Sequence, residues 1–191
     1  EGYTVDELSF QSTEASCGPD IHFDRPQKTG VFTVPGFLKK NKNVKVLGSV
    51  SNSPHNQSFL VENNLLYLKL KDAEKYECGD ILTIFRRVKK KVRHPDSRFK
   101  SFGSMYRIVG EVRVLHRYGN YVTASVRTSW SEINRGDLVG PAQPAVVQMP
   151  VLVPEGDLRG SIIGSLAQEH SINTNRHTVF LDRGSTDGLK V

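Results

Sequence analysis

The chain has 191 residues, a net charge of +6, and a composition of 37% hydrophobic and 24% charged residues, which is typical of a globular protein that buries its own core. It contains no apolar run long enough for a membrane-spanning helix and no segment with the layout of a secretory signal. The sequence also lacks the nucleophile elbow, the phosphate-binding glycine loops and the closely spaced His and Cys pairs of zinc sites. We therefore expect a protein that is not an enzyme and that binds no metal or cofactor.

The first 36 residues are expected to form an irregular leader, because "STEASCGPD" and "DRPQKTG" are rich in turn-forming residues. The sequence starts at Glu1 rather than at Met, so we expect a processed or excised fragment. From Val44 onwards the apolar residues recur with a period of two, and no segment sustains a helical period. This pattern predicts an all-β protein in which residues 37–145 form a small β-barrel.

The clearest hairpin signal is "VRVLHRYGNYVTASVRT", in which two alternating runs flank Gly119-Asn120. Val112, Val114 and His116 share one side, so His116 is expected to be half-buried. Two further pairs, Gly79-Asp80 and Gly136-Asp137, each precede a strand. A glycine there allows a positive φ and the aspartate can cap backbone N–H groups, so both pairs are predicted to be turns.

Residues 146–157 belong to a proline-rich stretch and are expected to form an extended connector. After it, residues 158–191 repeat the order of features seen after Val44: a Gly-Ser pair between aliphatic residues, a polar stretch and a short strand. We expect this segment to be an incomplete second copy of the barrel unit. Within it, "DRGSTDG" lacks the alternating ligands of a calcium loop and is interpreted as a turn.

The basic residues are concentrated in one region. Residues 86–117 contain eleven Lys and Arg and two acidic residues, a net +9, so the rest of the chain sums to −3. In a regular strand through "ILTIFRRVKKKVRH", four cations would lie on the solvent side, and Arg86 and Lys90 would lie at the rim of the apolar side. The four candidate binding residues are Arg87, Lys89, Lys91 and Arg93.

Two interpretations of this cationic row carry equal weight. The row can guard an edge strand against unwanted pairing. Alternatively, it can bind an anionic polymer such as an acidic glycan, lipid headgroups or the phosphates of a nucleic acid.

The two cysteines, Cys17 and Cys78, could form a disulfide if the protein lies in an oxidising compartment. Two free thiols are the alternative, and the sequence does not decide between them.

The segment from "GDILTIFRRV" to "INRGDLVGP" resembles the region that follows the LysM domain in certain bacterial envelope proteins. The resemblance is carried by turns and strand starts. These are Gly79, Asp80, Phe85, Arg86, Val92, His94, Pro95, Gly103, Gly110, Val112, Val114, Ala124, Glu132, Ile133, Gly136, Asp137, Val139 and Pro141. The units are also similar to the C-terminal β-barrel of the flagellar assembly protein FlgT.

This resemblance covers about residues 31–191 and implies a periplasmic or cell-envelope location. It also implies a non-catalytic scaffold role beside peptidoglycan, with the cell wall or another envelope protein as partner. The chain itself has no LysM domain, so LysM-type peptidoglycan binding is not implied.

The alternative function is nucleic-acid binding by a barrel of OB type, for which a basic strand face is expected. Such recognition also requires aromatic residues on the strand face. In this chain Phe99, Phe102 and Tyr106 lie in and after the "HPDSRFKSFG" loop, so the match is partial and nucleic acid is the less favoured partner.

Overall fold

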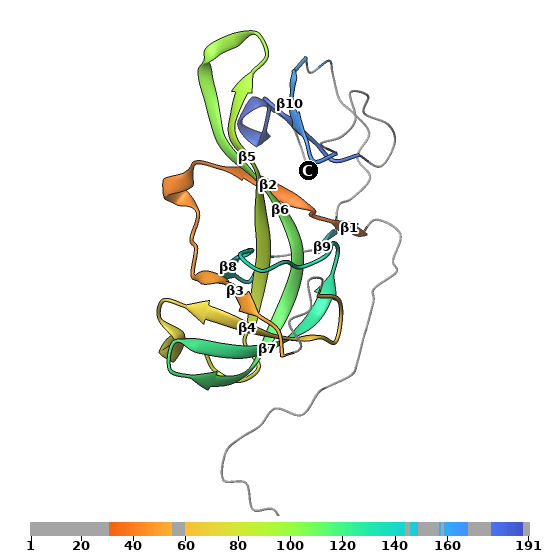
Figure 1. The fold of residues 1–191 in the computed structure, drawn as a ribbon. Helices are drawn as coiled ribbons and strands as arrows, with labels where there is room; N and C mark the ends of the chain where they lie inside the picture. The colour runs from red at the N-terminus through yellow and green to blue at the C-terminus, as the bar shows by residue number, and fades with distance from the viewer. Residues whose placement is uncertain are drawn as a thin grey trace, which may run out of the picture.

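The structure of the chain is a computed structural model that describes residues 31–54, 60–143, 146–148, 157, 159–167 and 177–188. This part of the chain is all-β: a closed six-stranded antiparallel barrel is accompanied by small two-stranded sheets (Figure 1). The strands are β1 (Val31–Thr33), β2 (Gly36–Lys39), β3 (Gly48–Asn52), β4 (Leu65–Leu70), β5 (Ile81–His94), β6 (Ser97–Tyr118), β7 (Tyr121–Ser129), β8 (Leu138–Pro141), β9 (Val146–Gln148), β10 (Ile162–Ser165) and β11 (Val179–Leu181). Three single turns of 3₁₀ helix are η1 (Asn41–Asn43), η2 (Ala73–Lys75) and η3 (Ser185–Asp187).

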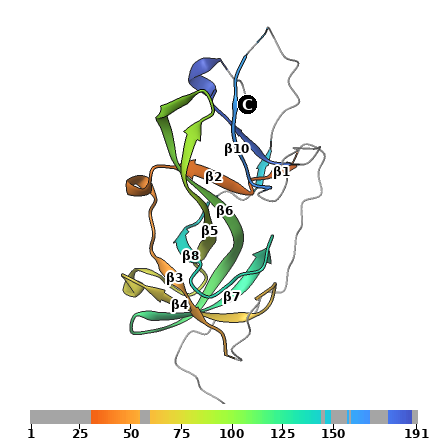
Figure 2. The same ribbon diagram turned by 45° about the horizontal axis from the view of Figure 1, so that its top comes forward.

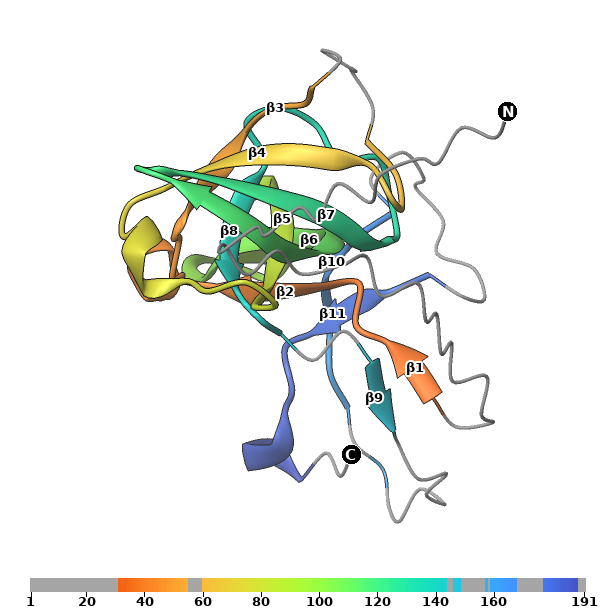
Figure 3. The ribbon, with the colours of Figure 1, turned by 90° about the horizontal axis from the view of Figure 1, so that it is seen from below.

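The barrel closes because β6 pairs with strands on both of its sides. The order around the ring is β6, β5, β8, β3, β4 and β7, and β7 pairs again with β6 (Figure 3). Closure leaves the ring without an unpaired edge. The ring strands run from Gly48 to Pro141, within the range expected for the barrel.

The barrel core follows the period-two pattern of the sequence. Alternate residues of β4 and β7 are buried, and Val112 and Val114 of β6 are buried with them, as predicted. The prediction for His116 is wrong, because this residue is exposed. The pairing of β6 with β7 shifts register between Val114 and His116, so the strict alternation ends before the histidine.

Both predicted Gly-Asp turns are confirmed. Gly79 has a φ of 98° and Gly136 a φ of 89°. The Oδ2 atom of Asp80 accepts the backbone N–H of Glu77 at 2.9 Å. The Asp137 Oδ2 atom accepts the N–H of Asn134 at 2.8 Å in the same way. Each carboxylate therefore closes its own turn three residues back.

The segment "DRGSTDG" forms a turn of the same design. Its residues 185–187 are η3, and the Asp187 Oδ2 atom accepts the N–H of Gly184 at 2.9 Å. Gly188 follows with a φ of 91°. Across the described residues, no group of three or more His, Cys, Asp or Glu could hold a metal ion.

The segments that were expected to be an irregular leader and an extended connector each contribute a β-strand. Val31–Thr33 pairs antiparallel with Val146–Gln148, so the chain is already regular before residue 36 and within the proline-rich stretch. Pro150 and Pro154 lie in the part of that stretch outside the described residues. No helix in the described ranges is long and apolar enough to cross a membrane.

Cys78 is disulfide-bonded. Cys17, the other cysteine of the chain, lies outside the described residues, so the pairing of these two residues stays a prediction.

Candidate functional site

The strands β5 and β6 are longer than the barrel that they help to form. β8 pairs with β5 only as far as Phe85, and β7 pairs with β6 from Gly110 onwards. The remainder of the hairpin, residues 86–107, projects beyond the barrel (Figure 2) and is called the arm below. Near the barrel, β2 pairs with β6 through residues 104–107, so the base of the arm has three strands.

The basic sequence lies in the arm, but the strand carrying it is not regular. The pairing of β5 with β6 shifts register between Arg87 and Lys89, between Lys89 and Val92, and twice more before His94. Bulges of this kind interrupt the alternation of faces. As a result Lys89, Lys90 and Lys91 are all exposed. The expected division into an apolar and a cationic side is borne out at Val88 and Val92 and at the four predicted cations. It is wrong for Lys90, which is exposed, and for Thr83 and Phe85, which are buried.

One face of the arm is covered by the small sheet of β10 and β11. Val92 and Met105 of the arm form a second buried cluster with Ile163 and Leu166. The partly buried residues packed against this cluster are Leu38, Val88, Phe102 and Phe180. A polar contact adds to this packing, because the His94 Nε2 atom lies 3.2 Å from the Asp182 Oδ2 atom.

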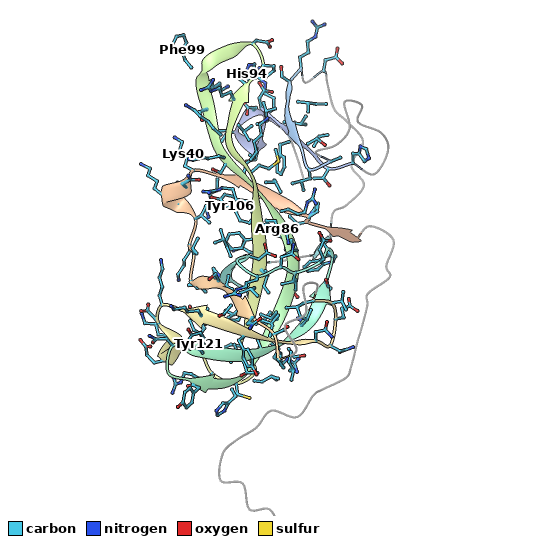
Figure 4. The ribbon with its side chains drawn as sticks, in the orientation of Figure 1. Lys40, Arg86, His94, Phe99, Tyr106 and Tyr121 are labelled. Carbon is cyan, nitrogen blue, oxygen red and sulfur yellow. The ribbon has the colours of Figure 1, made fainter. Side chains whose placement is uncertain are left out.

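Away from β10, the arm and the end of β2 enclose a groove of about 530 Å³, called the basic groove below. It is lined by Lys40, Asn41, Lys90, Lys91, Phe99, Ser101, Gly103 and Ser104. The lining contains three lysines and no acidic residue. Figure 4 shows Lys40 and Phe99 on the side of the arm opposite to β10. The three lysines are exposed, and Phe99 is 99% exposed.

The close approach of β2 to the arm depends on Gly103, which has a φ of 100°. A Cβ atom at this position would lie 2.5 Å from the Lys39 carbonyl oxygen and 2.7 Å from the Lys40 backbone nitrogen. Only glycine combines this φ with this contact. Gly103 therefore allows Lys40, from a distant part of the sequence, to join Lys90 and Lys91 in one groove.

The floor of the groove is held by hydrogen bonds around Ser104, which is 1% exposed. The Ser104 hydroxyl lies 2.6 Å from the Lys90 carbonyl oxygen and also contacts the Asn41 Oδ1 atom. The hydroxyl has a single proton and so donates to one of these two acceptors at a time. The Tyr106 hydroxyl donates to the same Asn41 oxygen at 3.0 Å. Since the serine is bonded to a backbone carbonyl and an amide, it is not paired with a general base of the kind that activates a nucleophile.

A second hollow of about 460 Å³ adjoins the basic groove, and Asn41 lines both. Arg86 in this hollow forms a two-pronged ion pair with Asp137: Nε to Oδ1 is 2.7 Å and Nη2 to Oδ2 is 2.8 Å. The Arg86 Nη2 group also donates to the Glu132 carbonyl oxygen at 3.0 Å. The hydrogen bond to Asp137 raises the pKa of Arg86. Arg86 is half-buried, in keeping with the expected position at the rim, but its charge is neutralised by the Asp137 carboxylate, which the sequence did not predict.

Three aromatic rings fix the base of the arm to the barrel. The Phe37 ring stacks on Tyr106 with centroids 5.1 Å apart. The Phe85 ring meets both of them edge to face, at 5.5 and 5.6 Å. Phe85 and Tyr106 are 3% exposed, so this cluster gives the arm a rigid root.

The four cations predicted to form a binding row are all exposed, but the structure does not keep them together. Lys91 lines the basic groove and Arg87 lines the adjoining hollow, whereas Lys89 and Arg93 line neither. The prediction missed Lys40, Lys90 and Phe99. Lys90 could have been found only by anticipating the bulges, and Lys40 only by knowing that β2 pairs with β6.

Neither a protein-family model nor a curated protein sequence matches this chain.

Proposed function

We propose that this chain is a non-catalytic interaction module of a bacterial cell-envelope protein, and that its basic groove contacts an anionic polymer. The proposal that the groove binds an anionic polymer rests on the residues that line it. Three exposed lysines converge there without an acidic side chain, an arrangement that attracts anions and is not needed by the fold. The envelope location, with the periplasmic cell wall or another envelope protein as partner, rests on the resemblance of the sequence to regions that follow LysM domains.

The edge-guarding interpretation accounts for part of the basic sequence. β8 leaves β5 after Phe85, so beyond that point no strand within the described residues is paired with β5 on the side opposite to β6. Lys89 and Arg93 lie on this stretch and line neither the basic groove nor the adjoining hollow. We propose that these two cations protect the edge, whereas Lys90 and Lys91 act together with Lys40 in binding.

The same unit is proposed to begin again after the connector. The hairpins β3–β4 and β10–β11 are both antiparallel, and each has a register shift within its first strand. Each is followed by an aspartate that accepts the N–H three residues before it, Asp80 in one case and Asp187 in the other. These features support the interpretation of residues 158–191 as an incomplete copy of the barrel unit.

Nucleic acid is the second candidate partner, because the structure places Phe99 beside Lys90 and Lys91, where a base could stack. The architecture adds no support for it: an OB fold is a five-stranded barrel, and this ring has six strands.

The test is sedimentation of the chain with purified bacterial cell wall that retains its anionic polymers, at low and at high salt. Two variants are compared, one with Lys40, Lys90 and Lys91 replaced by serine and one with Lys89 and Arg93 replaced by serine. We expect wild-type binding to weaken steeply with salt and to be lost only in the first variant. Equal binding by wild type and the first variant, with both folded, would rule out the groove as the contact.

A further inference from the structure

The arm has two faces of opposite character. One face is buried against β10 and β11 through the cluster around Val92 and Met105. The other presents the basic groove, and at its outer end Phe99 is 99% exposed (Figure 4). A phenyl ring held in water at the end of a projecting hairpin adds nothing to the stability of the fold, since it is buried against nothing. Its position next to three lysines combines apolar and cationic chemistry on one surface.

The details of this surface discriminate between anionic partners. A single-stranded polymer with stacking bases is held by successive aromatic side chains, but the groove lining has one aromatic residue, Phe99. Individual phosphates are bound with two parallel hydrogen bonds by the planar guanidinium group of arginine. Here the cations that line the groove are lysines. In the next hollow Arg86 is already bound to Asp137, and Arg87 is the single exposed arginine of its lining. Lysines beside a protruding apolar ring match a lipid interface, where cations meet headgroups and the ring enters the acyl boundary.

We propose that the arm docks on an anionic lipid surface, with Phe99 inserted at the acyl boundary and Lys40, Lys90 and Lys91 against the headgroup phosphates. This inference rests on the proposed function, because it names the partner of the same groove. Charge complementarity supports it: the acidic residue on the arm is Asp96, at the tip beside His94, and it is not part of the groove lining.

The size of each contribution follows from the chemistry. A lysine close to an anionic membrane strengthens binding on the order of fivefold, so removing all three should weaken it on the order of 100-fold. Burying the exposed phenyl ring should account for roughly another tenfold. The first effect should fade with added salt, whereas the second should persist.

The experiment is cosedimentation of the chain with phosphatidylcholine vesicles that contain or lack phosphatidylglycerol. The variants are Phe99→Ser and the triple variant in which Lys40, Lys90 and Lys91 are serine. A matched triple variant replaces three exposed lysines of the barrel region and loses the same net charge; its positions are Lys69, Lys71 and Lys75. Each protein is also titrated with dextran sulfate, a soluble polyanion without an apolar interior, and with a single-stranded oligonucleotide. Circular dichroism melts check that every variant is folded.

We expect wild type to bind the anionic vesicles and not the neutral ones. The groove triple variant should lose vesicle and dextran sulfate binding, and the matched triple variant should keep most of both. Phe99→Ser should weaken vesicle binding roughly tenfold and leave dextran sulfate binding unchanged.

Groove-dependent binding of dextran sulfate without binding to vesicles would overturn the lipid inference and leave the proposed function standing. Loss of oligonucleotide binding in Phe99→Ser, with vesicle binding unaltered, would overturn it in favour of nucleic acid. If the groove triple variant matches wild type on every polyanion, both proposals fail.

Discussion

The contact between β2 and the arm gives the sharpest structural prediction. Replacing Gly103 by alanine forces a side chain into a backbone with a φ of 100°, which costs about 1–2 kcal/mol. In addition, the new Cβ would lie 2.5 Å from the Lys39 carbonyl oxygen, closer than real Cβ contacts allow, so the end of β2 must move away from the arm. Overpacking of this kind costs a further 1–3 kcal/mol or so. We expect Gly103→Ala to lower the free energy of unfolding by about 3 kcal/mol.

A matched control separates the two contributions. Gly136 has a similar φ of 89°, but a Cβ atom there meets nothing within 4 Å. Gly136→Ala should therefore cost only the backbone strain of about 1–2 kcal/mol. Urea unfolding followed by the fluorescence of Trp130, the single tryptophan, measures both variants. Equal losses of stability in the two variants would refute the close packing of β2 on the arm.

Three further predictions concern the turn at Gly136 and the carboxylates of Asp137 and Asp182. Gly136→Val should destabilise the protein by about 1 kcal/mol or more through strain alone; an unchanged melting temperature would contradict the turn. Arg86→Met should cost about 3 kcal/mol in urea unfolding because it leaves the Asp137 carboxylate buried and unpaired, and adding Asp137→Asn should restore part of this loss. The hydrogen bond from the Ser161 N–H lowers the pKa of Asp182, so its stabilising contribution is present above the ordinary carboxyl pKa of about 4 and is lost as pH falls through the lowered value. The protection of the β10 amides, taken relative to their intrinsic exchange rates, should fall over that acidic range, and an equally large fall in Asp182→Asn would contradict the assignment.

The barrel was predictable because its strands and turns are encoded locally. Alternating apolar residues predicted β7 and the barrel part of β6, and the buried Val112 and Val122 confirm this pattern. The Gly-Asp pairs predicted turns because positive φ and an N–H acceptor are properties of these two residue types. Each of these inferences used residues that lie within a few positions of one another.

The groove was not predictable, because it depends on relations between distant segments. The pairing of β2 with β6 brings Lys40 to the arm, and no feature near Lys40 in the sequence indicates that partner. The bulges in β5 place Lys90 on the exposed side with its neighbours, whereas simple alternation had put it with the apolar residues. The ion pair of Arg86 was not predictable either, because its partner Asp137 lies in a turn far along the chain.

The central claim is that an anionic partner binds in the basic groove, and NMR mapping tests it most directly. A ¹⁵N-labelled sample is titrated with a short soluble polyanion at low salt, and the amide shifts are followed residue by residue. The account predicts shifts concentrated at Lys40, Lys90, Lys91 and Phe99 and reversed by salt. It predicts little change at Tyr121, which begins β7 at the far end of the barrel (Figure 4). Shifts centred elsewhere on the molecule, or none while the protein is folded, would contradict it.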